Sequence, residues 1–451
     1  MVTKAQLATL GLFDAKVPRY TSYPTAPHFG RDIGAGDFIR WIQAIPQGSK
    51  ISLYVHVPFC RRLCWFCACR TQGTQTDKPV IAYLETLKTE LQMLGTYLPL
   101  GVQLSRLHWG GGTPTLLQPA MMQELAEAIK KIAPFTDDTE FSVEIDPNEI
   151  DGPRLDALAA AGMNRASIGV QDFNEDIQRS IGRLQGYDIT KWAADEIRAR
   201  GVASLNADIL YGLPHQSKAR ITESVQKLLS LNPDRVALYG YAHVPWMAKR
   251  QQMLPSDALP TPEERLELYE TARRLFLWDN YAEIGIDHFA TQDDGLTTAL
   301  KAGRLRRNFQ GYTDDTADVL IGVGASSISK FPQGFAQNAP ATGAHTGAIR
   351  EGRFSTSRGH AFSDEDRLRS RMIEQLMCEF RIDAAEMSDT FGVSPQRIRK
   401  MLDAGAAPFN GLVKVDDSGL NVPPKARALT RMIARSFDAY ELSKAGHSSA
   451  I

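Results

Sequence analysis

Short apolar runs alternate with longer amphipathic segments from residue 51 onward. The apolar runs have the length of β-strands, and the segments between them have helical spacing. We expect strands at 51–57, 104–109, 140–146, 164–170, 203–210, 234–241 and 282–289. We expect helices near 79–98, 119–133, 153–161, 174–181, 188–200, 217–230 and 262–279. This alternation predicts a parallel sheet covered by helices.

The carboxyl ends of the expected strands have polar or glycine-rich sequences, such as HVPFC, WGGGTPT, EIDPNE, GVQDFN and ADILYGLP. In (β/α) barrels the functional groups lie at the carboxyl ends of the strands. No GxGxxG follows the first strand, which argues against a dinucleotide-binding fold. We therefore predict an α/β fold in which residues 49–300 form an open or closed barrel.

The barrel is flanked by regions of other character. Residues 1–48 are mixed, with a segment rich in Pro and Tyr that we expect to act as a lid over a substrate. Residues 301–360 are rich in Gly and are expected to be an irregular connection. Residues 361–451 combine helical patterns with GLVKVDDSGLNV, a hairpin pattern turning at Asp-Asp-Ser-Gly. We predict a small, mostly helical, winged-helix-like domain there.

The charge and the termini restrict the class of protein. The chain has 51 basic and 52 acidic residues and a net charge of −1, which gives no argument for binding nucleic acid. We find no secretion signal and no apolar run long enough to span a bilayer. We expect a cytoplasmic protein, and a monomer because no heptad pattern is present.

Four of the five cysteines lie within ten residues, in the stretch CRRLCWFCAC. In a reducing compartment such a cluster more often binds metal than forms disulfides. Cys60, Cys64 and Cys67 can hold three irons of a [4Fe–4S] cube, and the fourth iron then lacks a protein ligand. A zinc site and a redox CxxC are the alternatives, but the first lacks a second cysteine pair and the second leaves Cys60 and Cys69 unexplained.

The cysteine motif, with an aromatic residue before its last cysteine, resembles the signature of the radical S-adenosylmethionine (SAM) enzymes. Further segments, among them VPRYTSYPTAPHF, LHWGGGTPT, VEIDP, DILYGLP, YAHVP, DHFA and RNFQGYT, occur in one order over nearly the whole chain. Together they resemble the family of oxygen-independent coproporphyrinogen III oxidases. The resemblance implies a partial TIM-like barrel of the radical SAM type.

The same resemblance implies the cofactors and the residues that hold them. It implies a [4Fe–4S] cluster on Cys60, Cys64 and Cys67, with the open iron binding SAM, and a second SAM nearby. The first SAM would contact Tyr54, Gly111, Glu144 and Ile328. The second would contact Phe66, Gly112, Thr113, Gln171, Arg183, Asp208 and Ala242. On sequence alone, Arg183 is a helical, solvated residue.

Cys69 separates this family from a related haem-chaperone-like group that lacks a fourth cysteine. The resemblance implies that Cys69 is needed for activity without binding the cluster. Here Arg70 follows it, where the family often has Asn.

The resemblance also implies a reaction in which two propionates of coproporphyrinogen III become vinyl groups, giving protoporphyrinogen IX in haem biosynthesis. An external electron donor and an acceptor, which the sequence does not identify, would take part. Arginine is the natural partner of carboxylates, so Arg19, Arg165 and Arg307 are candidate substrate ligands. Tyr20, Tyr23 and His288 are further substrate candidates. A haem-binding protein or an enzyme acting on another tetrapyrrole is the alternative function.

Overall fold

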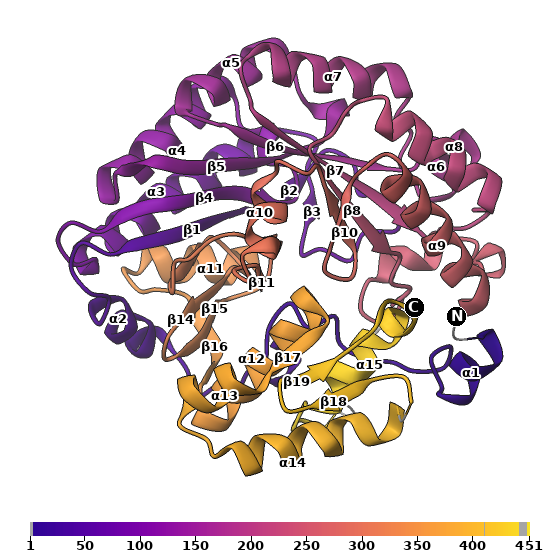
Figure 1. The fold of residues 1–451 in the computed structure, drawn as a ribbon. Helices are drawn as coiled ribbons and strands as arrows, with labels where there is room; N and C mark the ends of the chain where they lie inside the picture. The colour runs from indigo at the N-terminus through magenta and orange to yellow at the C-terminus, as the bar shows by residue number, and fades with distance from the viewer. Residues whose placement is uncertain (1–2, 410, 442–448) are drawn as a thin grey trace.

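The computed structural model describes residues 3–409, 411–441 and 449–451. Within these residues the main sheet has twelve strands, in the order β16-β15-β14-β13-β1-β4-β5-β6-β7-β8-β10-β9. The helices that connect the central strands lie along the outer side of this sheet (Figure 1). The inner side and the carboxyl ends of the strands are thus left for a site.

The centre of the sheet consists of parallel strands, each of which is followed along the chain by at least one helix. The strands are β1 (Lys50–Val57), β4 (Gln103–Gly111), β5 (Phe135–Ile145), β6 (Arg165–Gln171), β7 (Ser204–Tyr211) and β8 (Arg235–Gly240). The helices are α3 (Lys78–Tyr97), α4 (Pro119–Ile132), α5 (Gly152–Ala161), α6 (Glu175–Ser180), α7 (Tyr187–Ala199), α8 (Lys218–Leu229) and α9 (Pro262–Trp278). These elements confirm the predicted alternation of strand and helix.

Local sequence signals explain where these helices begin and end. The Asp151 side chain accepts from the Arg154 N–H, and Thr261 and Glu264 form a capping box at the start of α9. Gly162 ends α5 in the left-handed conformation, with φ of +102°. Side chains alternate between the two faces of β4. Trp109 is therefore buried against the helices, whereas His108 lines the barrel interior.

The prediction of a single strand at 282–289 was wrong. The chain there forms two short antiparallel strands, β9 (Ala282–Ile284) and β10 (His288–Ala290), and β10 pairs antiparallel with β8. Gly285 turns the chain with φ of +55°, and the Ile286 N–H donates to the Tyr312 hydroxyl at 3.0 Å. The parallel strands therefore end at β8, and an antiparallel hairpin closes this end of the sheet.

The prediction of an irregular connection at 301–360 was also wrong. Strand β13 (Leu320–Val323) pairs parallel with β1, and β14 (Ile328–Phe331), β15 (Gly334–Asn338) and β16 (Thr356–Ala361) extend the sheet antiparallel. Before them, α10 (Gly295–Lys301) leads to the hairpin of β11 (Arg306–Asn308) and β12 (Gly311–Thr313). Helix α11 (Thr342–Arg350) lies between β15 and β16.

The C-terminal region has the predicted helices and hairpin. Its helices are α12 (Asp364–Glu379), α13 (Ala384–Phe391), α14 (Pro395–Ala406) and α15 (Thr430–Arg435). Its strands β17 (Arg381–Asp383), β18 (Lys414–Asp416) and β19 (Gly419–Asn421) form a separate three-stranded sheet. The order of helices and strands matches the winged-helix-like expectation.

The N-terminal segment contains α1 (Lys4–Thr9) and α2 (Ala35–Gln43). Its apolar side chains, including Leu12 and Val17, share one core with those of the C-terminal region. The N-terminal segment is thereby joined to the C-terminal region, with α1 lying beside the C-terminus in Figure 1.

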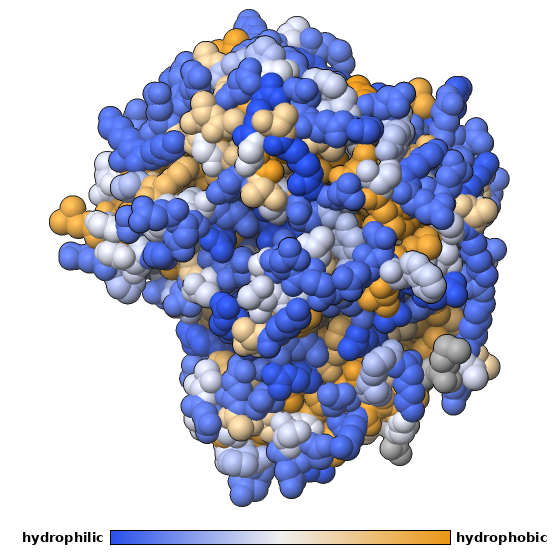
Figure 2. Space-filling view, turned by 45° about the horizontal axis from the view of Figure 1, so that its top comes forward, coloured by the Kyte–Doolittle hydropathy of each residue, from blue (hydrophilic) through white to orange (hydrophobic). Residues whose placement is uncertain are grey.

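The surface is mainly hydrophilic on the face shown in Figure 2, with apolar side chains in scattered patches. No helix among the described residues is both long and apolar enough to cross a membrane.

Candidate active site

The cysteine loop follows β1, the first barrel strand. It is fixed at its start by β2 (Phe59–Cys60), which pairs with β3 (Gln72–Gly73), so that the Thr74 N–H donates to the Cys60 carbonyl at 2.9 Å. Cys64 is buried, Cys60 and Cys67 are partly buried and Cys69 is exposed, and none of them forms a disulfide. The loop thus presents its thiols at the carboxyl edge of the barrel.

Arg183 reaches this loop from the connection between α6 and α7. Its Nη1 donates to Cys64 Sγ at 3.5 Å and to Asp146 Oδ2 at 3.0 Å, and its Nη2 donates to the Gly169 carbonyl at 3.0 Å. The side chain is 9% exposed. The expectation of a solvated helical residue was therefore wrong, because the loop after α6 folds back over the strand ends.

Cys69 acts on its neighbour Cys67. The Cys69 backbone N–H donates to Cys67 Sγ at 3.4 Å. A hydrogen bond from the Cys69 side chain, with this backbone contact, outweighs burial and lowers the pKa of Cys67. Burial raises the pKa of Cys60 to about 11. Cys69 thus donates to the sulfur of Cys67 through its backbone N–H.

The residues present fit an iron–sulfur cluster. Three free thiols come from one loop, and the Arg183 guanidinium lies beside one of them to offset thiolate charge. Cys378, which lies outside the cysteine loop, is buried in a separate hydrophobic core with Ile284 and Leu305. Within the residues described, no three His, Cys, Asp or Glu side chains are placed to hold a single metal ion.

The glycine-rich loop after β4 packs against the cysteine loop through its backbone. The Gly112 N–H donates to the Val57 carbonyl and the Thr113 N–H to the Phe59 carbonyl, each at 2.8 Å. A Cβ at Gly112 would lie 2.5 Å from the Phe59 carbonyl oxygen. Gly111 has φ of +113°, which side chains disfavour. This close approach explains why glycines are needed here.

Glu144, at the end of β5, is held by two donors. The Gly111 N–H lies 3.0 Å from its Oε2, and His108 Nε2 lies 3.2 Å from its Oε1. Burial raises the pKa of Glu144, but these hydrogen bonds outweigh it and hold the pKa below its usual value. The side chain is therefore an oriented carboxylate facing the barrel interior.

Two histidines that the sequence analysis missed support this side of the site. His108 stacks on Tyr54 with ring centroids 5.6 Å apart, and His56 Nδ1 lies 3.0 Å from the Tyr54 hydroxyl. His56 Nε2 also lies 3.2 Å from the carbonyl of Arg70, next to Cys69. The alternation of side chains in YVHV along β1 and in RLHW along β4 could have indicated these two histidines, because it places their rings on the inner face of the sheet.

The residues expected around a second SAM lie farther along the sheet edge. Gln171 ends β6 with φ of +69°, a conformation rare for a non-glycine residue. Its side chain and that of Arg183 both lie over Gly169. Asp208 of β7 accepts from Asn206 Nδ2 at 2.8 Å, and burial raises the pKa of Asp208 to about 6.

Gln251, another residue that the sequence analysis missed, connects two of the expected contacts. Its Nε2 donates to the Phe66 carbonyl at 2.7 Å and to the Ala242 carbonyl at 3.1 Å. Its side chain is fully buried, and its Oε1 accepts from the Val244 N–H. The loop after β8 is thereby tied to the cysteine loop, a link between distant segments that no local pattern indicates.

Ile328 begins β14, after a turn held by a buried network. Glu90 of α3 accepts from the Gly324 N–H and from Asn338 Nδ2, each at 2.8 Å. The Tyr83 hydroxyl accepts from the Ala325 N–H at 2.8 Å and donates to the His56 carbonyl at 3.1 Å. This network links the turn before Ile328 to the end of β1.

A cavity of about 210 Å³, called the barrel cavity below, lies inside the sheet. Glu144, Asp208 and His288 line it. His288 is buried, with Nδ1 at 2.7 Å from Asp287 Oδ1 and Nε2 at 3.4 Å from the Tyr239 hydroxyl. The structure thus brings His288 to the same cavity as two expected cofactor residues.

The N-terminal candidates lie away from the cysteine loop. Arg19 donates to the Gly240 carbonyl. The Tyr20 hydroxyl donates to Asp438 at 2.9 Å, and the Tyr23 hydroxyl accepts from the Ala439 N–H at 3.0 Å. Both tyrosine hydroxyls are therefore bonded to the C-terminal domain, while both residues line a second cavity.

Comparison with known proteins gives the family. The model of the Radical SAM superfamily matches residues 54–228, and that of the HemN C-terminal domain matches residues 362–429. An oxygen-independent coproporphyrinogen III oxidase from Paracoccus denitrificans is 66% identical over 451 residues, the full length of both chains. The chain belongs to the family of oxygen-independent coproporphyrinogen III oxidases.

A solved structure extends this family likeness to three dimensions. Coproporphyrinogen III oxidase (HemN) from Escherichia coli, described as a radical SAM enzyme, has a TM-score of 0.90 and 35% identity, covering 95% of this chain and all of that one. The match confirms the α/β fold with its radical SAM barrel and C-terminal region. Membership of the radical SAM superfamily implies a [4Fe–4S] cluster and SAM as cofactors.

Proposed function

We propose that this protein converts two propionates of coproporphyrinogen III to vinyl groups without oxygen, giving protoporphyrinogen IX in haem biosynthesis. Each propionate loses one hydrogen atom from its β-carbon, one further electron and CO2. The single observation that carries the proposal is the cysteine loop packed against the Gly111–Thr113 backbone beside Glu144, in a chain of this family.

Cys60, Cys64 and Cys67 would hold the cluster, and its fourth iron would take SAM. When bound, the cluster would supply the one electron that cleaves SAM into methionine and a 5′-deoxyadenosyl radical. The thiols fit this role because they are free and share one loop, with Arg183 beside Cys64. Cys69 would position Cys67 through its backbone N–H and side chain rather than bind iron.

The chain's own residues would orient the cofactor. Glu144 is a fixed acceptor suited to ribose hydroxyls. Gly111 lies on the neighbouring strand β4, and Tyr54 and Ile328 lie on β1 and β14 of the same sheet. A second SAM would contact the residues expected for it. These are Phe66, Gly112, Thr113, Gln171, Arg183, Asp208 and Ala242. Support for this group comes from Gln251, which ties Phe66 to Ala242.

The remaining expectations stay predictions. They include the domain boundaries at 48, 300 and 360, the lid role of the N-terminal segment, the monomeric state and the cytoplasmic location. The substrate roles of Arg19, Tyr20, Tyr23 and His288 also stay predictions, as does the need for an external electron donor and acceptor.

The test is anaerobic turnover after cluster reconstitution. With SAM, dithionite and coproporphyrinogen III, we expect protoporphyrinogen IX, CO2 and 5′-deoxyadenosine. Cys64→Ser should abolish all three products, whereas the matched variant Cys378→Ser, which changes a cysteine outside the loop, should retain them. Tight haem binding without SAM cleavage or decarboxylation would overturn the proposal and favour a haem-binding role.

A further inference from the structure

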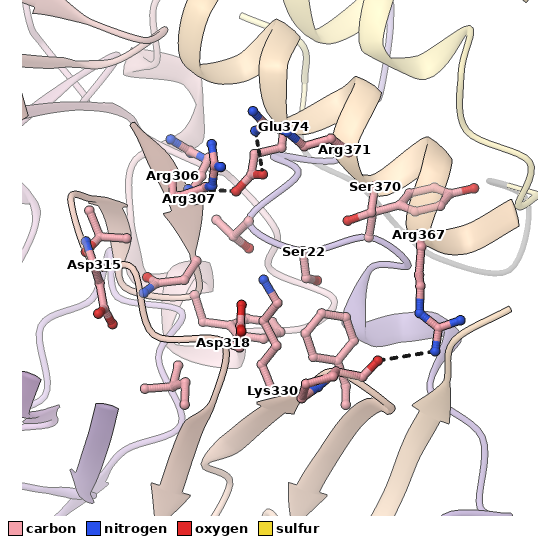
Figure 3. A pocket seen from close by; sticks show the side chains of 18 of the residues that line it. Ser22, Arg306, Arg307, Asp315, Asp318, Lys330, Arg367, Ser370, Arg371 and Glu374 are labelled. Carbon is pink, nitrogen blue, oxygen red and sulfur yellow. Dashed lines mark hydrogen bonds and ion pairs between the residues drawn. The ribbon is translucent and has the colours of Figure 1, made fainter. Parts of the chain in front are cut away.

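A cavity of about 620 Å³ lies outside the barrel, between the N-terminal segment, the β11–β12 hairpin, the β14–β15 hairpin and α12 (Figure 3). We call it the arginine cavity, because arginines from β11 and α12 line it. Its size is within the usual range for sites of organic ligands. No residue of the cysteine loop lines it.

Several cations of the arginine cavity lack a strong partner in the protein. Within the described residues Lys330 and Arg304 have no carboxylate partner, and Arg306 donates only to the Leu305 carbonyl at 3.4 Å. Arg367 pairs with Asp364 at 3.0 Å, and that carboxylate is fully exposed. Arg306, Lys330 and Arg367 come from β11, β14 and α12, so they approach the cavity from different sides (Figure 3).

Other arginines of the same cavity are already neutralised. Arg371 pairs with Glu374 at 2.9 Å and with Glu386 at 2.6 Å. Arg307 faces Asp287 at 3.5 Å and is buried. The contrast separates arginines that stabilise the fold from Arg306 and Lys330, whose charges remain available to a ligand.

Aromatic rings form an apolar wall of the cavity. Phe335 packs edge to face against Phe309, with centroids 5.4 Å apart, and against Phe362 at 4.9 Å. Phe331, which also lines the cavity, is fully buried. An apolar wall facing unpaired cations suits an organic ring that carries several carboxylates.

The arginine cavity adjoins the barrel cavity. The two share Asn308, Thr313, Asp315 and Leu320 as lining residues. The barrel cavity also holds Glu144 and Asp208, both expected cofactor contacts. A ligand in the arginine cavity can therefore extend a side chain past these shared residues toward the place of reaction.

We propose that the arginine cavity binds the tetrapyrrole, with Arg306, Lys330 and Arg367 holding propionate carboxylates that are not reacting. The reacting propionate extends into the barrel cavity. Asp318, which also lines the arginine cavity, offers an acceptor for pyrrole N–H groups. This inference rests on the proposed function, since it locates the substrate of that reaction.

Binding can be tested apart from catalysis. The probe is coproporphyrin III, the stable oxidised form of the ring, followed by fluorescence quenching on the reconstituted protein. Arg306→Gln and Lys330→Gln should each raise Kd about tenfold, the effect expected on losing one charge-assisted hydrogen bond. The neutral tetramethyl ester should bind wild type and variants alike. Iron content and melting temperature check that the variants fold.

Matched controls carry the same substitutions outside the cavity. Arg353→Gln and Lys301→Gln change exposed cations that do not line the cavity and should keep the wild-type Kd. Unchanged Kd in both Arg306→Gln and Lys330→Gln would overturn the inference. If these variants lose coproporphyrin but the wild type does not decarboxylate coproporphyrinogen, the site stands and the proposed function fails.

Discussion

Arg183 places its guanidinium nitrogen 3.5 Å from the sulfur of Cys64, although the two residues are 119 positions apart in the chain. Asp146 holds the same guanidinium at 3.0 Å. A buried cation beside a cluster ligand favours the reduced, more negative state of the cluster.

The first prediction follows from this contact. Arg183→Gln should lower the midpoint potential of the reconstituted cluster by tens of millivolts, where about 59 mV corresponds to a tenfold change for one electron. The measurement is a redox titration followed by electron paramagnetic resonance without SAM. Arg179→Gln, an exposed arginine of α6, is the control. Equal potentials in both variants would show that Arg183 does not tune the cluster.

The second prediction concerns the glycine-rich loop. Gly112→Ala should reduce iron incorporation and SAM binding, because its Cβ would lie 2.5 Å from the backbone oxygen of Phe59, which cannot move aside like a side chain. Gly343→Ala is the control, since a Cβ there meets nothing within 4 Å. Iron analysis and SAM titration report the effect, and wild-type values for Gly112→Ala would contradict it.

The third prediction is a pH dependence at Asp208. Burial raises the pKa of this carboxyl to about 6, so the folded protein holds its proton more tightly than the unfolded chain does. The free energy of unfolding therefore falls as the pH rises from about 4 to 6, and the ionised group costs about 3 kcal/mol at neutral pH.

Asp208→Asn should accordingly raise the melting temperature of the cofactor-free protein at pH 8 and leave it unchanged at pH 4. Asp293→Asn, which changes an exposed carboxylate, should raise it at neither pH. Melting curves over this pH range provide the measurement. A gain for Asp208→Asn that is equal at pH 4 and pH 8 would refute the role of ionisation.

The fourth prediction tests the network before Ile328. Glu90→Ala leaves the buried Gly324 N–H without its acceptor and removes one acceptor of Asn338 Nδ2, at a cost of about 3 kcal/mol in the free energy of unfolding. Denaturant unfolding measures this loss. Glu85→Ala, an exposed change on the same helix, is the control and should change stability little. Equal losses in the two variants would contradict the role of the network.

Much of the fold could be predicted because its signals are local. The apolar runs and caps that specify β1, β4 to β8 and α3 to α9 lie within each element. The expectation failed at 282–289, where Gly285 interrupts an apolar run, and at 301–360, where short strands form only by pairing with neighbours. Strands of three to six residues carry too little periodicity to be identified without their partners.

Some residues of the candidate site could likewise be predicted from the sequence, and others could not. The cysteines, Gly111, Gly112 and Glu144 could be chosen from motifs and from their places at strand ends. Arg183 was expected to be solvated, and Gln251 was missed, since each acts on a segment far away in the sequence. His56 and His108 could have been found from strand alternation.

By itself, the sequence determined the order of the central strands and helices, the gathering of four cysteines in one loop after β1, and the family resemblance. Only the tertiary structure decided that Arg183 faces Cys64, that Cys69 donates to Cys67, and that Arg306, Lys330 and Arg367 surround one cavity. The physical reason is that periodicity reports burial along a short segment. Contacts between distant residues depend on how the sheet curves and on which loops fold back over its edge.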